Sequence, residues 1–98
     1  MAGGLLAMMR RETRVTHGRA PHALGGREPP ETSWLLDEDS FLLRARGDHY
    51  FHYRRGDGIT IERGPGADPA TEPLWLAGSV HAAIACLNGL VPVHASAV

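Results

Sequence analysis

The sequence predicts a mixed α+β fold with a small antiparallel sheet, one amphipathic helix and a terminal strand. Short runs of alternating apolar residues between positions 41 and 62 predict the sheet. Apolar residues at helical spacing between positions 76 and 87 predict the helix, and an almost wholly apolar run at 90–98 predicts the last strand. A chain of 98 residues has room for one small domain.

The sheet is expected from three aromatic or β-branched runs, at residues 41–46, 49–54 and 59–62. Gly47-Asp48 separates the first two runs, and the glycine-rich residues 55–58 separate the second from the third. Such short connections are typical of hairpins. The three runs therefore predict an antiparallel meander.

The helix is expected to begin after Asp68-Pro69, an N-cap residue followed by a proline at the first helical position. Glu72 suits the positive end of the helix dipole. The helix is expected to end at Asn88-Gly89, with Pro92 just beyond it. One face of the helix is apolar and consists of Leu76, Val80, Ala83, Ile84 and Leu87.

Residues 90–98 have the length of a strand and are apolar except for His94 and Ser96. A nearly continuous apolar run of this length is typical of a strand that is buried on both faces. An unpaired apolar strand would leave a terminal carboxylate beside apolar surface, which is unfavourable unless the carboxylate reaches water. We therefore expect the domain to continue, or a partner or a second copy to cover this strand.

The first third of the chain, residues 1–33, is expected to be a disordered tail, and residues 34–98 the folded domain. Glycine and proline pairs interrupt this tail, and neither helical nor strand periodicity persists. Its arginines could touch nucleic acid, but acidic residues dilute them and no aromatic residue precedes Trp34. We expect a solvated terminus and no nucleic-acid partner.

Residues 74–93 could alternatively form a transmembrane helix, because a run of this length without Asp, Glu, Lys or Arg can span a bilayer. Polar residues and a helix stop lie within this run, at His81, Asn88, Gly89 and Pro92. The centre of a membrane span tolerates such residues poorly. We therefore expect no membrane partner.

Composition excludes several chemistries for this chain. All ten basic residues are arginine, so no lysine is available for a phosphate-binding Walker loop or a Schiff base. The formal net charge of -1 does not favour polyanionic partners. The single cysteine, Cys86, cannot form an internal disulfide, which agrees with a reducing cytoplasm.

The stretch Gly89-Leu90-Val91-Pro92-Val93-His94-Ala95-Ser96-Ala97-Val98 resembles the His-Ala-Ser-Ala-Val strand of HPr kinase/phosphorylase-like proteins. These are serine kinases with a phosphoenolpyruvate-carboxykinase-type P-loop core. The upstream order is similar too: a sheet with a Leu-Leu-Arg strand, a Gly-Ala-Asp-Pro linker, and an apolar helix ending in Gly-Leu. The resemblance covers about residues 34–98.

The resemblance implies a transferase that uses ATP or pyrophosphate, together with Mg²⁺, to phosphorylate serine on a small carrier protein. It places the Walker loop and the metal-binding acids after the position of Val98. We therefore expect no cofactor in this chain, and no catalysis by the chain alone. One residue carries over: His94 matches the strand histidine that the family places near the nucleotide site and counts as catalytic. Histidine beside a phosphate can donate a hydrogen bond or move a proton.

Other motifs favour a structural role. His49 and His52 would face opposite sides of a strand, and His81 and Cys86 lie too far apart on a helix to share a metal ion. The aromatic residues at 50–53 lack the pattern of an RNA-binding sheet. Three consecutive acids at 37–39 favour a solvated turn rather than a metal site.

Two functions of different classes remain open. The first is an N-terminal segment of an HPr serine kinase-like protein. The second is a protein-interaction module that pairs through an exposed strand edge.

Overall fold

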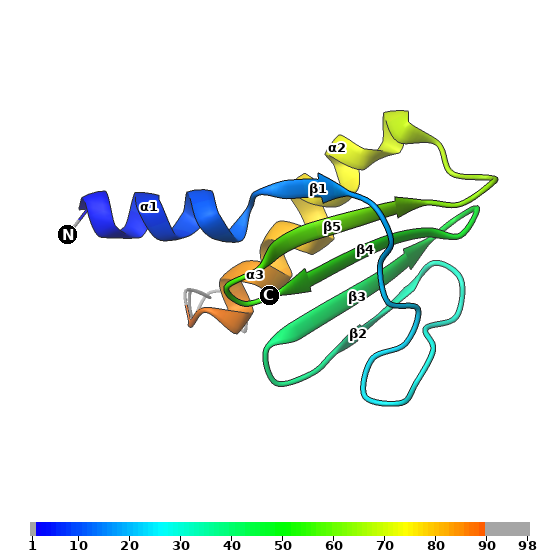
Figure 1. Cartoon of the computed structure of the whole chain (residues 1–98), viewed down its shortest axis with the longest axis horizontal. Helices are drawn as coiled ribbons and strands as arrows, with labels where there is room; N and C mark the ends of the chain where they lie inside the picture. Colours follow the sequence, from blue (N-terminus) through cyan, green and yellow to red (C-terminus); the bar gives the residue numbers. More distant parts are fainter. Residues whose placement is uncertain (1, 90–98) are drawn as a thin grey trace.

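A computed structural model describes residues 2–89 of the chain. Five strands form one sheet in the order β1-β5-β4-β3-β2, and the helices that follow β5 lie across one face of it (Figure 1). The fold is α+β, as predicted. Residues 90–98, which include the predicted terminal strand and His94, lie outside the described part of the chain.

The predicted meander is confirmed by strands β3 (Ser40–Ala45), β4 (His49–Arg54) and β5 (Gly58–Arg63). Both pairings are antiparallel, with Leu43 opposite Phe51 and Phe51 opposite Ile61. The turn between β3 and β4 places Gly47 and Asp48 at φ 81° and 57°. Residues 46–48 connect the paired Ala45 and His49, and positive φ suits glycine and is tolerated by aspartate.

Alternation along these strands divides the buried residues between the two sheet faces. The helix-covered face carries the larger core. Leu42 and Tyr50 face the other side, where Ala20 and Leu24 of the long loop after β1 pack against them. The main core consists of Phe41, Leu43, Ala45, Phe51, Tyr53, Ile59, Ile61, Val80, Ala83 and Ile84.

The predicted helix is confirmed as a continuous helical run that starts at Pro69 and ends at Leu87. Its parts are a 3₁₀ turn (Pro69–Thr71), α2 (Glu72–Trp75), a π turn (Leu76–Val80) and α3 (His81–Leu87). The Asp68 side chain caps the start by accepting a 3.0 Å hydrogen bond from the N–H of Ala70. Gly89 ends the run at φ 71°.

The predicted apolar face of this helix is confirmed as well. Val80, Ala83 and Ile84 are buried against the sheet, and Leu76 and Leu87 pack on the same core. The π turn was not predicted. It lengthens one helical turn by a residue, and Gly78 lies at its centre.

The sheet differs from the prediction at both edges. Strand β2 (Ser33–Leu36) extends the meander antiparallel to β3, whereas β1 (Val15–His17) pairs parallel to β5, so the sheet is mixed rather than purely antiparallel. Each edge strand has at most four residues. The three residues of β1 are too few to show a period-two pattern, and the β2 sequence Ser-Trp-Leu-Leu does not alternate between polar and apolar residues.

The first third of the chain also differs from a tail without regular structure. It contains α1 (Ala2–Glu12) and β1. Backbone contacts hold this part in place: the N–H of Ile59 donates to the carbonyl of Arg14 at 2.8 Å, and the N–H of Gly18 donates to that of Ile61 at 3.0 Å. Backbone hydrogen bonds are independent of side-chain type, so sequence periodicity did not reveal them.

No helix within residues 2–89 is both long and apolar enough to cross a membrane.

Candidate functional site

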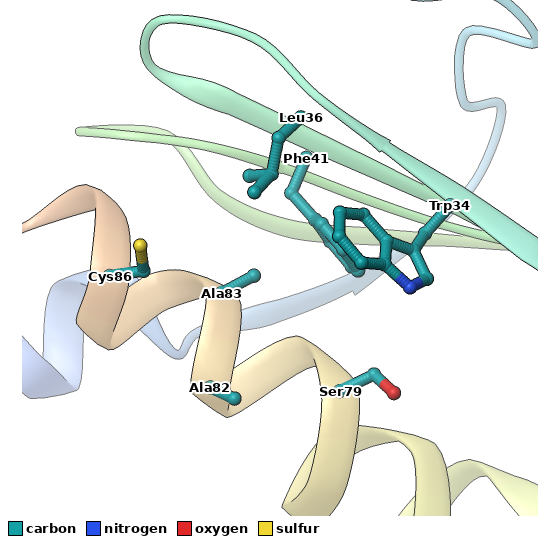
Figure 2. Close-up of a pocket in the computed structure, with 7 residues that line it drawn as sticks. All are labelled: Trp34, Leu36, Phe41, Ser79, Ala82, Ala83 and Cys86. Carbon is teal, nitrogen blue, oxygen red and sulfur yellow. The ribbon is translucent and has the colours of Figure 1, made fainter. Parts of the chain in front are cut away.

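An apolar groove lies between the β2 edge of the sheet and the helical run, with a volume of about 310 Å³ (Figure 2). Its sheet side is formed by Trp34 and Leu36 of β2 together with Phe41 of β3. The rings of Trp34 and Phe41 lie 6.0 Å apart and are tilted by 37°. Trp34 is 52% exposed and Leu36 is 37% exposed, although both are large and apolar. The groove thus leaves apolar surface open along the sheet edge.

The helix side of the groove carries only small side chains, and this explains why the space is open. Ser79, Ala82, Ala83 and Cys86 face Trp34 and Leu36 across it (Figure 2). The larger helix residues Val80 and Ile84 point instead into the main core. Cys86 is exposed and unpaired, so its thiol belongs to the groove surface.

The outer edge of β2 presents backbone groups as well as side chains. The N–H of Asp37 donates to the carbonyl of Ser40 at 2.9 Å, which makes these two residues a hydrogen-bonded pair. Such pairs alternate along an antiparallel ladder, so Leu35 and Ser33 also bond to β3. The backbone groups of Trp34 and Leu36 therefore point away from the sheet, and no described segment bonds to them.

Glu72, at the start of α2, is the centre of a polar cluster. Its carboxylate accepts hydrogen bonds from Arg63 Nε at 2.8 Å and Nη2 at 2.9 Å. It also lies 2.6 Å from His49 Nε2 and 3.4 Å from His17 Nε2. The Arg63 guanidinium, helped by the two imidazoles, outweighs burial and lowers the pKa of Glu72 to about 2. The cluster ties the helix start to β1, β4 and β5.

A second polar cluster surrounds Glu12, which is fully buried at the end of α1. Its carboxylate accepts hydrogen bonds from the Tyr53 hydroxyl, from the N–H of Gly56 at 2.8 Å and from Arg11 Nε at 2.8 Å. Burial disfavours the charge, but these donors outweigh it and the pKa of Glu12 lies below its ordinary value. Asn88 Nδ2 donates to the same hydroxyl at 2.7 Å. The cluster joins α1, β4 and the end of α3.

Both clusters are internally satisfied. Among the described residues, no buried side-chain nitrogen or oxygen lacks a hydrogen-bond partner. A catalytic base or nucleophile needs a face open to substrate, and Glu12, His49 and Tyr53 are buried within the protein. Glu12 and Glu72 therefore act as structural anchors.

The opposite sheet face is covered by the loop after β1. The His22 ring stacks on Tyr50 with centroids 4.0 Å apart, and its Nε2 lies 3.0 Å from the Glu62 carboxylate. Ala20 donates its N–H to the same carboxylate at 2.8 Å. The aromatic strand is thus used for packing on both faces, as the structural reading of residues 50–53 predicted.

His49 lies on the helix side of the sheet and His52 on the other, as strand alternation predicted. Within residues 2–89, no three His, Cys, Asp or Glu side chains form a group that could hold a metal ion. Asp37 and Glu38 are exposed in a turn, where the Asp37 carboxylate accepts the N–H of Glu38 at 2.9 Å. Asp39 lies 3.7 Å from Arg54.

His94, the candidate catalytic residue, lies outside the described residues, so its position remains a prediction. The groove was not predicted from the sequence, although Trp34-Leu35-Leu36 is a conspicuous apolar run beside the acidic turn. No protein-family model matches this chain, and no curated protein or solved structure is significantly similar to it.

Proposed function

We propose that this chain is the N-terminal part of an HPr serine kinase-like protein, in which residues 2–89 form a non-catalytic platform. The observation that carries the proposal is the sequence His94-Ala95-Ser96-Ala97-Val98, which follows an apolar helix with the expected stop at Asn88-Gly89. The order of the described elements, a meander followed by this helix, agrees with the layout that the resemblance implies.

The platform role is supported by what the described residues offer chemically. They do not fit Mg²⁺-ATP, because they include no lysine and no cluster of three potential metal ligands. Their buried carboxylates, Glu12 and Glu72, are held by internal donors. No phosphoryl-transfer step is therefore assigned to residues 2–89, and His94 is the one residue of the chain proposed to be catalytic.

The proposal is tested first by the intact mass of the gene product isolated from its native cells. We expect a product substantially heavier than 10.6 kDa, with a Walker loop shortly after Val98 and ATP-dependent serine phosphorylation of a small carrier protein. A product of 10.6 kDa that folds alone would contradict the kinase proposal. Phosphoserine formation by the 98-residue chain itself would contradict the platform role.

The role of His94 is tested in the heavier product. His94→Ala should lower phosphoryl transfer by about 10²-fold, which is typical for the loss of a group that moves a proton. His81→Ala is the matched control, because His81 is an exposed histidine on the helix. Equal turnover in the two variants would exclude a catalytic role for His94, provided that both variants melt at the wild-type temperature.

A second candidate function is a protein-interaction module that pairs through an exposed strand edge. The observation that favours it is the open β2 edge, where Trp34 and Leu36 expose apolar side chains beside the groove. This interaction function uses only residues within the described part of the chain, 2–89. The two functions are compatible if the platform uses this edge to hold a partner.

A further inference from the structure

We infer that the β2 edge and the groove receive an extended segment of a partner protein that has alternating apolar side chains and a basic residue at its end. The inference rests on the interaction function proposed above and adds the chemistry of the partner. Three properties of the described residues support it: free backbone groups, an apolar groove lined by small helix residues, and uncompensated negative charge at one end of the strand.

The backbone of β2 favours an added strand over a helix or a small ligand. Trp34 and Leu36 direct their N–H and C=O groups outward, since Ser33 and Leu35 bond to β3. A partner strand would satisfy these groups in the way that β-strand addition does elsewhere. The outward backbone groups and the exposed apolar side chains both belong to Trp34 and Leu36. One added strand can therefore bond to the backbone groups and contact the side chains at the same time.

The groove sets the pattern of the partner's side chains. Trp34 and Leu36 pair with Leu43 and Phe41, so their side chains point to the helix-covered face. Residues of an added strand that lie opposite Trp34 and Leu36 would point the same way and enter the groove. Small side chains at Ala82 and Cys86 leave room for branched aliphatic groups there. The next residues of the partner would face solvent and are expected to be polar.

The acidic turn after β2 determines which charge is expected at the end of the partner strand. Asp37 and Glu38 follow β2 directly, are exposed, and form no ion pair with any described residue. Asp39 differs, because it lies 3.7 Å from Arg54. A basic residue at the matching end of the partner strand would neutralise the charge of Asp37 and Glu38.

A second copy of this chain fits less well. A two-fold pairing of β2 strands centred on Leu35 would place Ser33 opposite Asp37 and Thr32 opposite Glu38. Neither supplies a positive charge, and Glu31 would face the acidic Asp39. Charge complementarity therefore favours a different, basic partner.

The test uses the full 98-residue chain labelled with ¹⁵N and the peptide acetyl-Arg-Val-Thr-Val-Thr-Val-Arg-amide, titrated to about 1 mM by NMR. We expect the largest shifts at the Trp34 indole and at the amides of Trp34 and Leu36. The same peptide N-methylated at every valine lacks the N–H groups for the new ladder and should not bind. Trp34→Ala should weaken binding about tenfold, whereas Leu74→Ala, which removes a side chain that is 76% exposed on α2, should leave it unchanged.

The charge is tested with a peptide in which glutamate replaces both arginines. We expect it to bind about fivefold more weakly at low salt, and we expect the double variant Asp37→Asn/Glu38→Gln to remove the difference. Equal binding of both peptides would overturn the inferred partner chemistry and leave the interaction function standing. No shift at Trp34 or Leu36 with any peptide would overturn both. A stable dimer by sedimentation that Trp34→Ala dissociates would show that a second copy, not a basic partner, occupies the edge.

Discussion

The Glu72 carboxylate lies 2.6 Å from Nε2 of the buried His49, and this contact joins the first turn of the helix to the start of β4. The sequence predicted Glu72 as a favourable charge near the helix dipole, and it predicted that His49 faces away from His52 and does not share a metal ion with it. The tertiary structure combines Glu72 and His49 with Arg63, which makes the cluster an anchor between the two layers of the fold.

Replacing Glu72 should therefore lower stability. Glu72→Gln keeps the size but removes the charge that Arg63 and His49 face, and we expect the free energy of unfolding to fall by about 1–3 kcal/mol. Urea denaturation monitored by tryptophan fluorescence measures this change. Glu38→Gln is the matched control and should change it by less than about 0.5 kcal/mol, because Glu38 is exposed. Equal effects of the two changes would contradict the anchor role.

Stability should also decrease in acid. The pKa of Glu72 is 4.5 in an unfolded chain and about 2 in the folded protein, so its contribution is complete above pH 4.5 and is lost as the pH falls toward 2. The expected loss from this residue is about 2–3 kcal/mol. Glu12 and Glu62 act in the same direction, because their pKa values are lowered too. Unfolding measured between pH 6 and pH 2 should show a shallower slope in Glu72→Gln than in the wild type, and parallel slopes would contradict this assignment.

Tyr53 is predicted to anchor α1. Tyr53→Phe leaves Glu12 and Asn88 without the hydroxyl that both contact, and we expect a loss of about 1–3 kcal/mol. Burial and the hydrogen bond to Glu12 raise the pKa of Tyr53 to about 12, so this contribution is present below pH 10 and is lost between pH 10 and pH 12. Tyr50→Phe is the control on the opposite sheet face, where no described hydrogen bond involves the hydroxyl. Amide hydrogen exchange of α1 should accelerate in Tyr53→Phe but not in Tyr50→Phe. Unchanged exchange in Tyr53→Phe would contradict the role of the Tyr53 hydroxyl in holding α1.

Gly47 is predicted to be the least replaceable glycine of the turns. A Cβ at Gly47 would lie 2.1 Å from the carbonyl oxygen of Gly66, which is backbone and cannot rotate away. Gly56 has a similar positive φ of 92°, but a Cβ there meets no atom within 4 Å. Gly56→Ala should cost about 1–2 kcal/mol from backbone strain alone, and Gly47→Ala at least about 3 kcal/mol. Thermal melting of the two variants tests the difference, and similar melting temperatures would refute the steric argument.

The sequence alone determined the meander and the helix, because both depend on local patterns. Alternating residues such as Phe41, Leu43 and Ala45 specify a strand with one apolar face toward the helix, and Asp68-Pro69 and Gly89 specify where the helix begins and ends. These signals involve neighbours in the chain, and the structure confirms them. The family assignment and the role of His94 also rest on sequence alone and stay predictions.

Only the tertiary structure decided the edges of the sheet and the groove. Strand β1 is held by backbone hydrogen bonds to β5, which carry no side-chain signature, and Glu12 becomes an anchor only because Tyr53 and Gly56 reach it from 41 and 44 residues away. The groove exists because small helix residues face the exposed Trp34 across the core edge. Contacts between distant segments depend on how elements pack, and no local period in a sequence records that packing.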